Sequence, residues 1–269
     1  MYQYIKLSDV QDEYILTNGI YINDVENYYI TDDWSPEMYD ALAFAGFISV
    51  SIKDEAGKAY LFPEMQFSYA VLHWNNLHIS KRLKDFISKK VIAHGYGISV
   101  NRDIEAVFDG ITNYHDDINW MIEPYLDILR ALKDPQHKYN LQLLSIELWD
   151  GEKLIGGEIG YIIGSIYTSL TGFFDRRNYS NFGKVQLLSL ALLLKKSGYR
   201  FWNMGHPHMD YKSDLGAIEY QRRDFLTMWM KYRDWKPGCR ISDRFFTCDE
   251  LLDDVVTGYK KVESSIRKA

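Results

Sequence analysis

The stretch from Gln142 to Phe225 restricts the possible folds more than any other part of the chain. Two runs of alternating apolar residues flank the turn sequence Asp-Gly-Glu-Lys, which predicts a β-hairpin. The next run has helical spacing, carries two lysines in its last turn and ends at a glycine. This order predicts an α/β fold in which the helix packs back on a sheet. The predicted elements are strands at 143–149 and 154–167, a helix from 180 or 181 to 198, a strand at 200–204, and a loop ending in DLGAIEYQRRDFL.

The residues before this stretch predict a small α+β domain. Ser35 and Pro36 are good first residues for a helix that ends at Gly46. Strands are expected at 47–52 and 59–62. We therefore predict an N-terminal α+β domain over residues 1–75 and a second domain over residues 76–269, with an extra C-terminal helix. The other predicted helices are 79–90, 100–112, 120–133 and 249–268.

Several short motifs match one known family in their order along the chain. They are SIELW at 145–149, LIGG at 154–157, Gly164, LGA at 215–217 and RRDF at 222–225, preceded by DWSP at 33–36, GF at 46–47, AVL at 70–72 and LHISKRLK at 77–84. With these motifs the chain resembles the leucyl/phenylalanyl-tRNA–protein transferase family, over residues 30 to 226. The resemblance implies that residues 76–269 form an N-acetyltransferase-like (GNAT) acyltransferase domain, capped by the N-terminal domain.

The resemblance also implies an activity. The protein would be a tRNA-dependent aminoacyltransferase, which moves an amino acid from aminoacyl-tRNA to the N-terminal amine of a protein or peptide and marks proteins for degradation. No cofactor is implied, because the ester is already activated and positioning supplies much of the acceleration. One alternative is a non-catalytic tRNA- or peptide-binding protein of the same fold. A small-molecule acyltransferase would need a glycine-rich turn for acetyl-CoA, and RRNYSNFG at 176–183 holds one glycine, so acetyl-CoA is not expected as a partner.

Composition narrows the class of protein further. With 269 residues, 46% of them hydrophobic and 25% charged, the chain has material for a substantial core. A net charge of −6 excludes a protein that coats nucleic acid through bulk charge, but it permits a local basic patch. Cys239 and Cys248 match no zinc or redox motif. The polar N-terminal sequence and the lack of a long apolar run predict a cytoplasmic protein with no membrane partner.

The most cationic segment is the predicted helix at 79–90. Charge runs are usually solvated helix faces. The functional alternative is a ridge that contacts tRNA phosphates through Lys81, Arg82 and Lys84, and both interpretations stay open. Arg222 and Arg223 likewise either bind phosphate or cap surface strands.

The chain departs from the family pattern at the residues expected to carry out catalysis. The family's Gly-Glu-Ser motif is replaced by Ser169-Leu170-Thr171, and its Asp-Cys-Gln by Asn203-Met204-Gly205 or, with another gap, by Met204-Gly205-His206. Asn203 and His206 are therefore the candidate catalytic residues, since a histidine can act as a base near neutral pH. The alternative for His206 is an exposed loop histidine. His206, His208 and Asp210 lack a fourth ligand nearby, so no metal site is predicted.

Four residues are assigned to substrate binding. Trp120 stands where the family keeps a pocket tryptophan, although a large aromatic at a helix start is also typical of a core. Tyr167 and Leu170, which follow Gly164, are also assigned to substrate binding. Glu158 stands where the family has an apolar pocket residue, and nearby glycines on its face of the strand predict open space beside the carboxylate. A buried carboxylate needs a cation or water, supplied either by the protein itself or by a basic group of the substrate.

Overall fold

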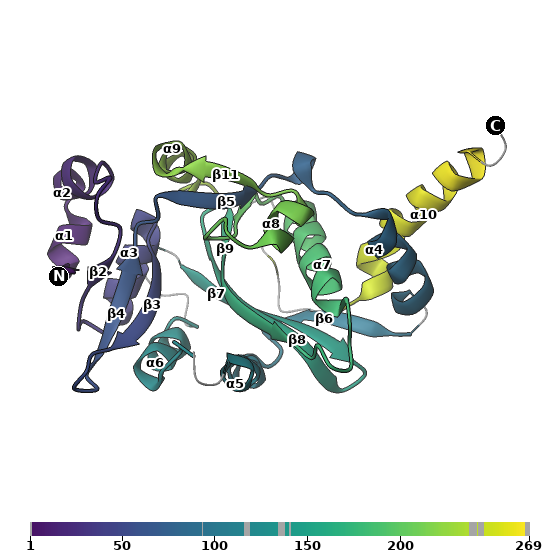
Figure 1. Ribbon diagram of the computed structural model, residues 1–269, viewed down its shortest axis with the longest axis horizontal. Coiled ribbons are helices and arrows are strands. Elements are labelled where there is room, and N and C mark those ends of the chain that lie inside the picture. Colours follow the sequence, from purple (N-terminus) through teal and green to yellow (C-terminus); the bar gives the residue numbers. More distant parts are fainter. Residues whose placement is uncertain are drawn as a thin grey trace.

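An eight-stranded mixed sheet forms the centre of the computed structural model, with the strand order β11-β5-β10-β9-β8-β7-β6-β12. The structure describes residues 2–92, 94–115, 119–133, 138–139, 141–236, 241 and 245–266, with side chains up to Thr257 in the last helix. Two small sheets, β1-β2 and β3-β4, belong to the N-terminal part. Figure 1 shows α7 and α8 on one side of the large sheet and α5 and α6 on the other. The predicted α/β class is confirmed.

The bounds of the elements follow the labels of Figure 1. The strands are β1 (Gln3–Tyr4), β2 (Tyr29–Ile30), β3 (Ile48–Lys53), β4 (Ala59–Glu64), β5 (Ser68–Leu72), β6 (Tyr96–Val100), β7 (Gln142–Asp150), β8 (Lys153–Ile163), β9 (Ile166–Phe174), β10 (Phe201–Asn203), β11 (Ile218–Gln221) and β12 (Phe245–Thr247). The helices are α1 (Leu7–Gln11), α2 (Glu13–Ile15), η1 (Leu16–Ile20), α3 (Pro36–Ala45), η2 (Trp74–Asn76), α4 (Lys81–Phe86), η3 (Ile87–Val91), α5 (Ile104–His115), α6 (Glu123–Ala131), α7 (Phe182–Lys196), α8 (Asp210–Leu215), α9 (Arg222–Tyr232) and α10 (Cys248–Ile266).

The predicted hairpin of β7 and β8 is present, but the strand expected over 154–167 contains a turn. The chain reverses at Gly164, and β9 then pairs antiparallel with β8. Gly164 has φ +57°, a backbone conformation that favours glycine. A Cβ at this position would also lie 2.2 Å from the carbonyl oxygen of Arg233, so no larger residue fits. Apolar residues continue on both sides of this glycine, which is why the sequence pattern concealed the turn.

The large sheet separates two hydrophobic cores. One core joins the sheet to α7, α4 and α10, with Tyr167 and Trp202 among its buried residues. The other joins the sheet to α3, α5, α6 and α9, with Tyr161 and Phe201 among its buried residues. Since successive strand residues point to opposite faces, neighbours such as Phe201 and Trp202 belong to different cores. The faces matter below, because they separate the predicted site residues.

The N-terminal part folds locally as predicted but shares its core with the large sheet. The Ser35 hydroxyl accepts a hydrogen bond from the Met38 amide at the start of α3, and Gly46 ends the helix with φ +99°. β5 lies inside the predicted domain 1–75, yet it pairs with β10 and β11 of the large sheet. A boundary at residue 75 would cut the large sheet, so a division between the two parts has to precede Ser68. That they fold as separate domains stays a prediction.

Two other sequence expectations differ from the structure. The loop ending in DLGAIEYQRRDFL is instead α8, the edge strand β11 and α9. The helix expected from Val100 begins at Ile104, because Val100 still pairs with Ile146 of β7. Within the described ranges, no helix combines the length and apolar composition that a membrane crossing requires.

Candidate active site

The sheet opens into a fork where β9 and β10 separate. These parallel strands pair only from Ile166–Phe201 to Thr168–Asn203. β9 then continues to Phe174, while the chain after β10 turns away through Gly205, which has φ +71°. The fork thus has residues 169–174 on one side and the segment Met204–His206, which we term the fork loop, on the other. An opening between two strands of one sheet can admit substrate next to side chains from both.

His206 is the partly exposed titratable residue of the fork loop. Its Nε2 lies 2.8 Å from a carboxylate oxygen of Glu64, and 41% of its side chain is accessible. Glu64, at the end of β4, is buried and also accepts a hydrogen bond from the Asn27 amide group at 2.7 Å. A hydrogen bond from Nε2–H to a carboxylate leaves Nδ1 with the lone pair, which is the tautomer that can accept a proton. His208 stacks beside His206, with ring centroids 5.9 Å apart.

Asn203 holds the fork loop in place. Its side chain is 1% exposed; its amide group donates to the Thr168 hydroxyl at 3.4 Å, and its carbonyl oxygen accepts from the Gly205 amide at 3.1 Å. The second contact is the turn-stabilising bond that asparagine often makes to the backbone two residues on. With these contacts Asn203 acts on the conformation of the turn that presents His206.

Glu158 lies in a polar cluster on the α7 side of the sheet. Its carboxylate accepts hydrogen bonds from the Tyr167 hydroxyl at 2.9 Å and the Ser169 hydroxyl at 2.5 Å. The indole of Trp202 donates to the same Ser169 oxygen at 2.7 Å. The open space expected beside Glu158 is absent, because the Tyr167 ring fills it: a Cβ on Gly160 would lie 2.3 Å from the Tyr167 hydroxyl oxygen. The expectation of open space was therefore wrong.

The cation that balances Glu158 comes from the protein. Burial raises the pKa of Glu158 to about 7, although the hydrogen bonds from Ser169 and Tyr167 and the charge of Lys212 lower it. Burial lowers the pKa of Lys212 to about 8, against the opposing effect of the Glu158 charge. The pair is thus internal to the fold, as the first of the two alternatives for Glu158 requires.

Protonation of Glu158 should make stability depend on pH. A carboxyl whose pKa is raised on folding binds its proton more tightly in the folded state, so its favourable contribution is present below its ordinary pKa and is lost as pH rises towards 7. Relative to Glu158→Gln, the wild type should lose about 3 kcal/mol between pH 4.5 and pH 7. Urea unfolding of both proteins across this range measures the difference. Parallel stability curves would contradict the assignment.

Trp120 and Leu170 lie on the opposite side of the sheet from Glu158 and Tyr167. Both pack against the core that α5, α6 and the N-terminal part share, whereas Tyr167 belongs to the core around α7. Trp120 contacts the Tyr125 ring edge-on, with centroids 4.9 Å apart. The structure therefore divides the four predicted substrate-binding residues into two pairs. A single pocket formed by all four does not exist in this conformation.

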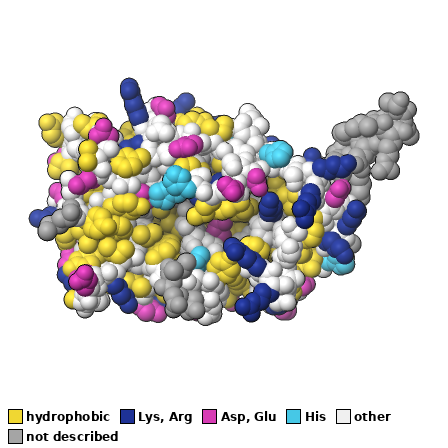
Figure 2. Space-filling model, viewed as in Figure 1, with side chains coloured by type: hydrophobic (Ala, Val, Ile, Leu, Met, Phe, Trp, Pro, Cys, Tyr) yellow, Lys and Arg dark blue, Asp and Glu magenta, His cyan; other side chains and the backbone are white. Residues whose placement is uncertain are grey.

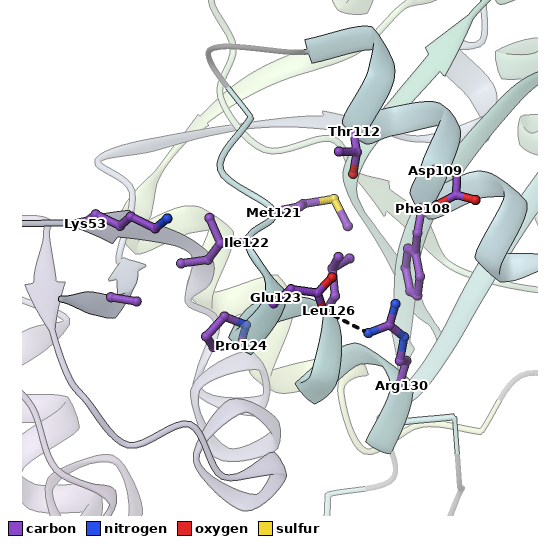
Figure 3. Close-up of a pocket in the computed structure, with 11 residues that line it drawn as sticks. Lys53, Phe108, Asp109, Thr112, Met121, Ile122, Glu123, Pro124, Leu126 and Arg130 are labelled. Carbon is purple, nitrogen blue, oxygen red and sulfur yellow. Dashed lines mark hydrogen bonds and ion pairs between the residues drawn. The ribbon is translucent and has the colours of Figure 1, made fainter. Parts of the chain in front are cut away.

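A separate open cavity of about 480 Å³ lies beside α5 and α6. Lys53 of β3 and Arg130 of α6 reach towards it from opposite sides (Figure 3). Arg130 forms ion pairs with three carboxylates, including Glu123 at 3.2 Å, so its charge is already matched. None of the predicted site residues lines this cavity, and we assign it no role in the reaction.

The predicted tRNA-binding residues lie in three different settings. Lys81 and Arg82 are exposed and Lys84 half-buried on α4. Figure 2 shows Lys and Arg side chains gathered on the side of the molecule that carries α4 and α10. Arg223 is exposed, but Arg222 is buried and donates to backbone carbonyls, including those of Gln66 and Asn23. The contacts of Arg222 explain its presence without a phosphate.

Cysteines and metal ligands add no further site. In the part of the chain that the structure describes, no three His, Cys, Asp or Glu side chains gather closely enough to hold a metal ion. Cys248 is a buried free thiol, and burial raises its pKa to about 12. Cys239 lies outside the described residues.

Two residues that the sequence analysis passed over belong to the site. Glu64 lies far upstream in another part of the fold, and no motif connects it to His206. Lys212 donates to the carbonyl oxygens of Met204 and His206 at 2.5 and 2.7 Å. Its place between the fork loop and the LGA motif was the only signal in the sequence.

A family model and the named relatives with similar sequences point to one family. A family model described as leucyl/phenylalanyl-tRNA protein transferase matches residues 71–230, from within β5 to within α9. A protein named leucyl/phenylalanyl-tRNA–protein transferase from Shewanella loihica is 30% identical over 188 residues, which is 65% of this chain and 73% of that protein. The protein of that name from Salmonella typhi is 28% identical over 157 residues, or 58% and 62%, so this match spans less than two thirds of the relative. Among solved structures, L-PGS from Bacillus licheniformis is 13% identical with a TM-score of 0.36, over 59% of this chain and 46% of that one.

Proposed function

Because the chain belongs to the leucyl/phenylalanyl-tRNA protein transferase family, we propose that it transfers an amino acid from aminoacyl-tRNA to the N-terminal amine of a protein or peptide. The observation that carries the proposal is the His206–Glu64 pair beside the fork, where a partly exposed imidazole is held by a buried carboxylate. The proposed reaction calls for neither a cofactor nor a metal. It needs a positioned ester, a positioned amine and an acceptor for one proton.

The proposed reaction uses His206 as the proton acceptor. The acceptor's α-amine attacks the carbonyl carbon of the aminoacyl ester, so that a C–N bond forms and the bond from carbon to the terminal ribose oxygen breaks. The amine proton passes to Nδ1 of His206 and then to the departing ribose oxygen. Glu64, bonded to Nε2, stabilises the imidazolium that forms in between. Asn203 keeps the turn that presents the imidazole in place.

The direct test is a transfer assay. The protein is incubated with tRNA charged with labelled leucine or phenylalanine and with a peptide whose N-terminal residue is arginine or lysine. We expect label in the peptide, and peptide with an acetylated N-terminus should accept none. Failure of every aminoacyl-tRNA to donate would overturn the proposal and favour the non-catalytic binding protein.

An apolar donor side chain fits the residues better than a basic one. The carboxylate of Glu158 has its hydrogen bonds and counter-charge from the chain itself, so it has no need of a basic substrate group. Trp120 and Leu170 offer partly buried apolar surface on the other side of the sheet, and we propose that they bind the aminoacyl side chain. This assignment suits leucine or phenylalanine. We further propose that the reaction takes place in the cytoplasm, where charged tRNA is found, and that degradation through the N-terminal residue is its consequence.

Acetyl-CoA should not bind. In the turn before α7, the Asp175 carboxylate accepts the Asn178 amide at 3.1 Å, and the Phe182 amide bonds to the Tyr179 carbonyl at 3.2 Å. A pyrophosphate would need such amides free and would face the Asp175 charge. Thermal melts should therefore shift by less than about 1 °C at saturating acetyl-CoA. A rise of several degrees would show that the turn rearranges and binds the cofactor.

A further inference from the structure

Lys212 is a buried lysine whose ammonium group contacts the backbone of the fork loop. The residue is 5% exposed, although it lies in the short helix α8 next to exposed neighbours. Its Nζ donates to the carbonyl oxygens of Met204 and His206 at 2.5 and 2.7 Å. These two carbonyls flank Gly205, so one side chain fixes both ends of the turn.

The other contacts of the fork loop hold its middle but not the carbonyl of His206. The Met204 amide donates to Ala70 of β5 at 2.9 Å, and the Gly205 carbonyl accepts from the Ala70 amide at 2.7 Å. The Gly205 amide bonds to the Asn203 side chain. Beyond these bonds, the backbone of His206 is held by Lys212 and its imidazole by Glu64.

A buried ammonium needs an opposite charge, and Glu158 supplies it. Glu158 is 6% exposed, and its charge raises the pKa of Lys212 against the larger, opposing effect of burial. Burial, and to a smaller extent the charge of Glu158, raises the pKa of both Tyr167 and Tyr211, so these two phenols stay neutral. The carboxylate thus keeps Lys212 charged, and the charge strengthens both bonds to the loop.

We propose that Lys212 is a positioning residue for the transfer reaction: it fixes the backbone of Met204–His206 so that the His206 imidazole meets the reacting amine. The role rests on the proposed function, in which His206 accepts the proton. Glu158 acts one step further away, by holding the lysine in its charged form. A misplacement of about 1 Å in a catalytic group can cost 100-fold in rate, which is the scale of effect that this contact controls.

Lys212→Met tests the proposal, because methionine has similar length but no donor. We expect the rate constant of transfer, kcat, to fall by about 10- to 100-fold while KM for aminoacyl-tRNA stays within about twofold. Lys212→Arg retains the charge and the donors and should recover part of the loss. The matched control is Lys184→Met. Lys184 of α7 pairs with Asp214 of α8, the helix that carries Lys212, and its replacement should leave kcat unchanged.

Hydrogen exchange gives a readout that does not depend on activity. In Lys212→Met the amides of Met204 and Gly205 should exchange at least about tenfold faster than in the wild type, while amides in β8 and α7 keep their protection. Faster exchange throughout the chain would show a general loss of stability instead and would count against positioning. Unchanged exchange together with unchanged kcat would overturn the proposal. If the wild type transfers nothing, the proposed function fails, and the exchange data still decide the role of Lys212 in the loop.

Discussion

Replacement of His206 by alanine should lower kcat/KM for aminoacyl transfer by about 100-fold to 10,000-fold, the range that general acid–base catalysis supplies. The expectation rests on one geometry: an accessible imidazole whose Nε2 lies 2.8 Å from the buried Glu64 carboxylate. The variant should still bind aminoacyl-tRNA, because the imidazole acts on the amine proton. Initial rates of label transfer at several substrate concentrations separate kcat from KM.

Two companion variants decide whether the effect belongs to His206. His208→Ala removes the neighbouring ring, which stacks on His206 but forms no ion pair with a carboxylate in the part of the chain that the structure describes. This substitution should cost less than about fivefold. Glu64→Gln retains a hydrogen-bond acceptor but loses the charge that stabilises the imidazolium, so it should be impaired to an intermediate degree. Equal losses from His206→Ala and His208→Ala, or no loss from either, would refute His206 as the proton acceptor.

Local signals in the sequence predicted the elements that surround the site. The serine cap and the terminal glycine predicted the bounds of α3 almost to the residue. The two lysines and the glycine at the C-terminal end of α7 predicted where that helix ends. These signals act within one turn of a helix, so they need no knowledge of the tertiary structure. The family motifs are of the same local kind, which is why the α/β class and the family could both be predicted.

The turn at Gly164 and the surroundings of Glu158 depend on tertiary contacts, which the sequence pattern does not show. Gly164 looked like one residue of a long apolar strand, and only the approach of the Arg233 carbonyl shows why the chain turns there. That turn brings Tyr167 back across β8 to fill the space beside Gly160 and bond to Glu158. The expectation of open space beside Glu158 failed at this step, because the residues that fill this space come from a strand that the sequence pattern did not separate.

The pairing of His206 with Glu64 was inaccessible for a related reason. A carboxylate at the end of β4 and a histidine after β10 meet because β5 carries the chain from the N-terminal part into the large sheet beside β10. No spacing rule connects such residues. Arg222 shows the converse: its motif suggested a phosphate contact, but its guanidinium lies inside the protein and bonds to carbonyls from the N-terminal part.

The basic helix α4 leads to the second large effect. Reversal of Lys81, Arg82 and Lys84 to glutamate should weaken tRNA binding and make it less sensitive to salt. Each phosphate contact contributes about 0.7 to 0.9 to the slope of log K against log salt concentration, because binding releases condensed counterions. Loss of three contacts should therefore flatten the slope by about 2 to 3. Filter binding of aminoacyl-tRNA between 50 and 200 mM salt, a range in which such slopes are well resolved, measures it.

A change in net charge alone would also weaken binding, so the control must carry the same charge change elsewhere. Lys53, Lys231 and Lys236 are exposed residues outside α4, and reversing them gives a variant of equal net charge. Long-range repulsion is screened over about 10 Å at 0.1 M salt, so this control should lower affinity modestly and leave the slope within about 0.5 of the wild type. Counterion release requires direct neutralisation of phosphate, and only the α4 variant removes it in the proposed complex. Equal slopes for the two variants would mean that α4 is a solvated surface, and that tRNA approaches the fork from another side.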